Sequence, residues 1–92
     1  MVYYVTANDP KTEKRACRKL QLESLSDCFF SPCTAFTYLA AKDVSDDEEM
    51  ALRLDILSFC DVLVVVTEID EQMRQEIEFA NLIGTEVRYL EV

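Results

Sequence analysis

The chain has 92 residues, of which 50% are hydrophobic, and it carries a net charge of −9 from 18 acidic and 9 basic residues. This length predicts one domain over residues 1–92 with a core of its own. The acidic balance excludes a protein that binds the phosphate backbone of a nucleic acid polymer. The longest apolar run, residues 62–66, is far too short to span a membrane, so we expect no membrane partner.

The charge is unevenly distributed. Residues 1–42 hold six basic and four acidic residues, whereas residues 43–92 hold three basic and fourteen acidic ones. Five of the basic residues lie between Lys11 and Lys19, where they predict the solvated face of a helix.

The cysteine and histidine content limits the kinds of metal site and catalytic nucleophile that the chain can form. The chain has four cysteines, no Cys-x-x-Cys pair and no histidine, which excludes the usual zinc sites and histidine-dependent nucleophiles. We therefore expect no metal and no other cofactor. Residues 1–9 lack the basic and apolar regions of a secretory signal, so we expect a cytoplasmic protein with reduced, mostly buried cysteines.

Strand and helix signals alternate along the chain. We predict strands near residues 2–7, 28–31, 61–66 and 86–91, and helices over 10–25, 46–58 and 71–83. Asp9 before Pro10 and the Ser45-x-x-Glu48 capping box start the first two helices, and Gly84 ends the third. Residues 34–42 fit either a short helix or an ordered loop.

This alternation predicts an α/β fold, a flavodoxin-like three-layer sandwich with a four-stranded parallel sheet in the order 2-1-3-4. The β-branched run at residues 62–66 belongs inside the sheet. In such sheets a ligand binds at the carboxyl ends of the strands, at the switch point between strands 1 and 3. The loops at residues 6–10, 31–35 and 67–71 would line that crevice.

Two carboxylates fall on apolar helix faces. At about 100° per residue, Glu76 lies inside the apolar arc of the third helix. Asp55 lies among Ala51, Leu52, Ser58 and Phe59 on the helix before it, with Arg53 on the polar face. Each carboxylate is either a structural acceptor or one of a pair that lines a common pocket near the strand ends.

The segments Leu54–Val65 and Asp70–Ala80, followed by Gly84, resemble the nucleoside 2-deoxyribosyltransferase superfamily, and most closely its small phage and bacterial domains. The opening Tyr4-Val5-Thr6-Ala7 is similar to the first strand of that family, and Phe30-Ser31-Pro32 is similar to the end of its second strand. The resemblance is strongest over residues 54–92.

The resemblance implies a role for each candidate residue. Glu76 would be the nucleophile that attacks the anomeric carbon, and Tyr4 would orient it. Asp70 would handle the leaving base, and Asp55 would be the helix aspartate of the family. The substrate would also contact Ala7, Asn8, Ser31 and Met73.

The leading interpretation is therefore a protein that binds a nucleoside or nucleotide and cleaves or transfers at the N-glycosidic bond. Gln72 replaces the glycine of the family motif, which favours a second interpretation, a non-catalytic nucleotide-binding module. A third is a protein-interaction module whose acidic surface is the functional feature. We also expect a homodimer or a larger homo-oligomer, since a chain of this size gains stability by association.

Overall fold

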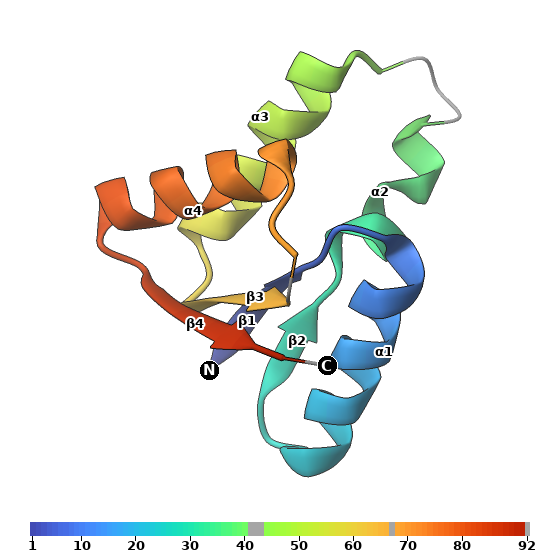
Figure 1. Ribbon diagram of the computed structural model, residues 1–92, viewed down its shortest axis with the longest axis vertical. Coiled ribbons are helices and arrows are strands. Elements are labelled where there is room, and N and C mark those ends of the chain that lie inside the picture. Colours follow the sequence, from blue (N-terminus) through green and yellow to red (C-terminus); the bar gives the residue numbers. More distant parts are fainter. Residues whose placement is uncertain (41–43, 67, 92) are drawn as a thin grey trace.

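The computed structural model describes residues 1–40, 44–66 and 68–91, in which strands and helices alternate (Figure 1). The elements in chain order are β1 (Val2–Thr6), α1 (Pro10–Glu23), β2 (Cys28–Phe30), α2 (Pro32–Ala40), α3 (Asp46–Ser58), β3 (Val62–Val66), α4 (Glu71–Ile83) and β4 (Glu86–Leu90). The segment that fitted either a helix or a loop is helical up to Ala40, and residues 41–42 lie outside the described residues. Helix α1 ends two residues before the predicted end, because Ser24 adopts an extended conformation.

The sheet has the predicted topology. Its strand order is β2-β1-β3-β4, and every neighbouring pair is parallel. All five residues of β3 are buried, which confirms that this β-branched run lies inside the sheet. Strands β2 and β4 are the two edges. The architecture is a flavodoxin-like α/β fold, as the alternation predicted.

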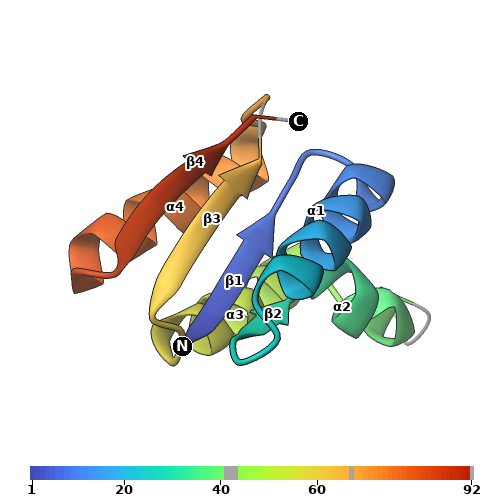
Figure 2. The same ribbon diagram turned by 90° about the horizontal axis from the view of Figure 1, so that it is seen from below.

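Helices cover both faces of the sheet. Helix α1 lies on one face, and α3 and α4 lie side by side on the other (Figure 2). The alternation of β1 explains the two cores, since Tyr3 and Val5 join the cluster beneath α1, while Tyr4 joins the cluster beneath α3 and α4. Helix α2 packs against α1, α3 and β1.

Three helices begin with a side-chain cap. Asp9, Ser45 and Asp70 accept hydrogen bonds from the backbone N–H of Thr12, Glu48 and Met73, respectively. Gly84 ends α4 in the left-handed conformation, with a φ of 80°. Because the sheet is parallel and its connections are crossovers, these three capped ends lie at the edge formed by the carboxyl ends of the strands. That edge is where the sequence places the crevice.

None of the four cysteines, all of which the structure describes, forms a disulfide. Cys60 is buried and Cys17 and Cys33 are half-buried, but Cys28 is exposed, so the expectation of burial is wrong for Cys28. Its place in the short edge strand β2 leaves it open to solvent. In the described part of the chain, no helix is long and apolar enough to cross a membrane.

Candidate functional site

A buried carboxylate lies between α4 and β1. Glu76, in the second turn of α4, has no exposed surface. The Tyr4 hydroxyl donates a hydrogen bond to its Oε2, and the Thr6 hydroxyl donates one to its Oε1 over 2.7 Å. Tyr4 and Thr6 are two residues apart on β1 and therefore face the same side of the sheet. The predicted burial of Glu76 is confirmed, and so is its position towards the carboxyl end of β1.

The surroundings of Glu76 have opposing effects on its ionisation. Burial raises the pKa of Glu76, while the hydrogen bonds from Tyr4 and Thr6 and the charge of Arg53 lower it, so that the pKa remains above its ordinary value. Burial and the Glu76 carboxylate also raise the pKa of Tyr4. The phenol therefore keeps its proton and stays a donor to Glu76 at neutral pH.

Arg53 of α3 belongs to the same buried cluster, and the sequence interpretation missed it. Its side chain is only 4% exposed. The guanidinium carbon lies 5.3 Å from the centre of the Phe36 ring, and Nε lies 3.6 Å from Oε2 of Glu49. Neither Nε nor Nη1 has a hydrogen-bond partner in the described part of the protein. The protein thus encloses a cation that forms an ion pair with Glu49 but whose donors Nε and Nη1 make no hydrogen bond to the described residues.

Glu13 of α1 is a second buried carboxylate that the sequence interpretation missed. It has no exposed surface, and its Oε2 accepts hydrogen bonds from the Ser31 hydroxyl at 2.5 Å and the Cys33 backbone N–H at 2.8 Å. Its Oε1 has no hydrogen-bond partner among the described residues. The charge of Glu13 also contributes to the raised pKa of Glu76.

A sequence signal for both missed residues exists. Glu13 shares the helical spacing i, i+3, i+4, i+7 with apolar positions of α1, and Arg53 shares it with apolar positions of α3. The full sets are Glu13, Ala16, Cys17 and Leu20 on α1 and Met50, Arg53, Leu54 and Leu57 on α3. A search for charged residues inside these stripes would have found both.

Asp55 does not take part in the cluster. The expectation that its side chain is poorly exposed is wrong, since Asp55 is exposed on α3. The arc assigned to the core also faces solvent. Its members Ala51, Leu52, Ser58 and Phe59 are all exposed. Apolar residues occur on several sides of α3, and the stripe that contains Leu57 is the one that packs against the sheet.

Asp70 and Met73 have structural surroundings. Asp70 is exposed and caps α4, with its Oδ1 accepting the backbone N–H of Met73 at 2.8 Å. The Met73 side chain is fully buried in the core beneath α3 and α4. Asp70 therefore lies at the solvent-exposed amino-terminal end of α4, whereas Met73 is enclosed in the core.

The remaining predicted residues follow β1 and β2. Ala7 is buried directly after β1, and Ser31 holds Glu13 after β2. Asn8 is exposed, and its Nδ2 donates to Oε2 of Glu68 at 3.5 Å, which links the loops after β1 and β3. Glu68 has a φ of 67°, a left-handed conformation that is uncommon for a residue other than glycine and is concentrated at functional sites.

A pocket opens beside the cluster, between the amino-terminal halves of α3 and α4. It has a volume of about 280 Å³, and apart from Met50 its walls are polar: Asp46, Asp47, Glu49, Gln72 and Gln75. Gln72 lies one turn before Glu76, and Glu49 lies one turn before Arg53. Glu49, which forms an ion pair with Arg53, connects this pocket directly to the buried cluster.

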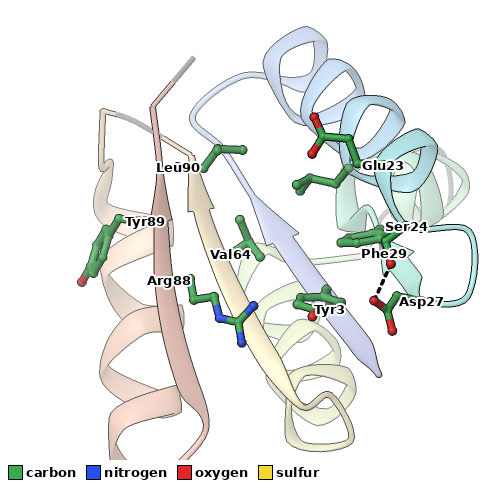
Figure 3. Close-up of a pocket in the computed structure, with 10 residues that line it drawn as sticks. Tyr3, Glu23, Ser24, Asp27, Phe29, Val64, Arg88, Tyr89 and Leu90 are labelled. Atoms are coloured by element: carbon green, nitrogen blue, oxygen red, sulfur yellow. Dashed lines mark hydrogen bonds between the residues drawn. The ribbon is translucent and has the colours of Figure 1, made fainter.

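Two other pockets lie elsewhere. A groove of about 430 Å³ lies on the α1 face of the sheet, where Tyr3 stacks on Phe29 and Arg88 lies over Tyr3 (Figure 3). A third, of about 620 Å³, is lined by Lys11, Lys14, Arg15, Arg18 and Thr34. Neither Glu76 nor Asp55 lines any of these three pockets, so the cavity we expected them to share is not among them.

Neither a search for metal-binding groups nor comparison with known proteins identifies a ligand for this site. Within residues 1–40, 44–66 and 68–91, no three or more cysteine, aspartate and glutamate side chains are grouped so that they could hold a metal ion. No protein-family model matches the chain, and no curated protein matches it in sequence.

Proposed function

We propose that this protein binds a nucleoside or nucleotide and cleaves or transfers at its N-glycosidic bond, with Glu76 as the nucleophile. The observation that carries the proposal is the buried Glu76 carboxylate, held by the hydroxyls of Tyr4 and Thr6 near the switch point of a parallel sheet. A fixed carboxylate in a site with little water suits a reaction whose transition state carries positive charge on the sugar.

The chemistry needs two steps. In the first, a Glu76 oxygen bonds to the anomeric carbon while the bond from that carbon to the base breaks and its electron pair leaves with the base. Asp70 is the candidate to supply a proton to the departing base. In the second step, water or another base attacks the anomeric carbon while the bond from that carbon to the Glu76 oxygen breaks and its electron pair returns to the carboxylate. Asp70, now deprotonated, takes up the proton that the attacking molecule loses. Tyr4 keeps its proton throughout and acts as a positioning residue.

The pocket beside α3 and α4 is the proposed route to the carboxylate. Its polar walls suit a sugar, but its volume of about 280 Å³ is just below the usual range for ligand sites. Because Glu76 has no exposed surface, substrate reaches it only when the side chains between pocket and carboxylate move. Gln72 and the pair formed by Glu49 and Arg53 are the candidates for this movement.

A non-catalytic nucleotide-binding module of the same fold is the second candidate. The burial of Glu76 also favours this second function. Both of its oxygens already accept hydrogen bonds, as those of a purely structural carboxylate would. For either function we propose a homodimer or larger homo-oligomer, for which the unpaired edge of β4 is an available surface.

The decisive experiment compares Glu76→Gln with the wild type. The amide is nearly isosteric but cannot act as the nucleophile, so release of free base should fall by roughly 10³-fold or more while the fold is kept. Both proteins would be incubated with a panel of nucleosides and nucleoside monophosphates, and free base would be measured by chromatography.

Glu78→Gln is the matched control, since Glu78 is an exposed glutamate on the same helix. It should release base at the wild-type rate. No base release by the wild type on any substrate would support the binding module instead. Equal release by wild type and Glu76→Gln would remove Glu76 from the mechanism.

A further inference from the structure

Two buried side chains of the Glu76 cluster have polar atoms with no hydrogen-bond partner in the part of the protein that the structure describes. Glu13 is fully enclosed, with its Oε2 fixed by Ser31 and Cys33 and its Oε1 unpaired. Arg53 is only 4% exposed; its Nε forms an ion pair with Glu49 at 3.6 Å, and its Nη1 has no hydrogen-bond partner among the described residues. Leaving such groups buried without a hydrogen bond destabilises a protein, so their retention calls for an explanation.

The two side chains belong to one cluster with the proposed nucleophile. The charge of Arg53 lowers the pKa of Glu76, and the charge of Glu13 raises it. Both also act on Cys33, whose pKa is raised to about 11 by burial and by Glu13 and is lowered by Arg53. Both side chains also contact the start of α2, since the Cys33 N–H donates to Oε2 of Glu13 at 2.8 Å and the Phe36 ring, one turn later, lies 5.3 Å from the guanidinium carbon of Arg53.

The charges of Glu13, Arg53 and Glu76 indicate which kind of ligand group could form hydrogen bonds with the unpaired atoms. An anion such as phosphate would pair with Arg53 but would meet the carboxylates of Glu13 and Glu76. A cation would meet the guanidinium of Arg53. A hydroxyl is neutral and both donates and accepts, so it can donate to Oε1 of Glu13 and accept from Nη1 of Arg53.

We infer that Glu13 and Arg53 form a subsite for a neutral hydroxyl group, which in a nucleoside would be a hydroxyl of the sugar. This inference rests on the proposed function, and it adds two specificity-determining residues to it. Entry to the subsite requires α2 to move, because the ring of Phe36 lies over the Arg53 guanidinium and is itself buried.

The test measures binding apart from catalysis. Glu76→Gln, which cannot form the covalent intermediate, would be titrated calorimetrically with adenosine, 2′,3′-dideoxyadenosine and adenosine 3′-monophosphate. A hydrogen bond to a charged group predicts that adenosine binds at least about tenfold more tightly than its dideoxy analogue. The 3′-phosphate should bind more weakly than adenosine, because it brings an anion next to the Glu13 carboxylate, which this variant retains.

A second substitution assigns this preference to Glu13. Glu13→Gln keeps an oxygen for the hydrogen bonds from Ser31 and Cys33 but replaces the unpaired acceptor with a donor. In the Glu76→Gln background it should reduce the tenfold preference for adenosine to less than about threefold. Glu23→Gln, which changes an exposed glutamate on the same helix, should leave the preference unchanged.

The outcomes separate this inference from the proposed function. Equal binding of adenosine and its dideoxy analogue would overturn the subsite, even if the wild type releases base. Tight, hydroxyl-dependent binding by a protein that releases no base would support the subsite and count against the catalytic proposal. Absence of binding by all three compounds would overturn both. If Glu13→Gln does not fold, the comparison of ligands on the parent protein decides.

Discussion

Helices α3 and α4 lie side by side on one face of the sheet, but their sequences differ in how clearly they mark the buried side. In α4 the apolar residues form one arc, and the helix packs on that arc with Met73, Glu76 and Ala80 buried. In α3 apolar residues occur on several sides, and the helix buries Arg53 and Leu57 instead of the arc around Asp55. A charged residue on a helix can therefore be assigned to the core only when the apolar arc is unambiguous.

The largest expected effect tests which side of α3 is buried. Leu57→Ala removes a fully buried side chain and should lower the free energy of unfolding by about 3 kcal/mol, because it leaves a cavity. Leu52→Ala, on the opposite arc, should cost less than about 1 kcal/mol, since Leu52 is 40% exposed. Urea denaturation of both variants measures the difference. Equal losses would show that α3 does not pack by the Leu57 side.

An intermediate effect tests the support of Glu76 on α4. Tyr4→Phe removes one of the donors to the buried carboxylate and should lower the free energy of unfolding by about 1–3 kcal/mol. Tyr3→Phe is the matched control from the next position of β1. The Tyr3 hydroxyl donates to the sulfur of Met1 over 3.8 Å and has no buried carboxylate as its acceptor, so its loss should change stability by no more than about 0.5 kcal/mol.

Comparison of these two variants tests whether the hydrogen bond from Tyr4 to Glu76 stabilises the folded protein. Thermal melts at neutral pH would give the ranking, and guanidinium denaturation would give the free energies. If Tyr3→Phe and Tyr4→Phe are equally stable, the hydrogen bond to Glu76 does not stabilise the folded protein.

The smallest effect is a pH dependence that distinguishes the carboxylate of α4 from that of α3. Burial raises the pKa of Glu76 in the folded protein, so the folded state binds a proton more tightly there than the unfolded state does. This contribution to stability is full below the ordinary glutamate pKa of about 4.3 and is lost as the pH rises through the raised value. Glu76→Gln should therefore gain stability relative to the wild type as the pH increases.

The free energy of unfolding of the wild type and of the variant would be measured at steps of about half a pH unit between roughly pH 4 and pH 8. Asp55→Asn is the matched control, because it removes a carboxylate from the exposed side of α3. If Glu76→Gln runs parallel to the wild type over this range, the ionisation of Glu76 is not coupled to folding.

The sequence by itself determined the sheet order and the strands and helices other than α2, which it left open between a helix and a loop. The β-branched run of β3, the capping residues Asp9 and Ser45, and Gly84 are local signals, and the right-handed rule for crossovers leaves few topologies for alternating strands and helices. Glu76 was also predictable, because one clear apolar arc on α4 contains it.

Only the tertiary structure decided the rest of the cluster. The packing of α3 depends on which of its apolar sides meets β1 and α4, and this choice is made by contacts with residues distant in sequence, such as Tyr4 and Met73. Glu13 becomes part of the cluster only because β2 and α2 bring Ser31 and Cys33 to it. A periodic pattern places a charge on a helix face, but only the assembled neighbours determine whether that charge is paired, exposed or left for a ligand.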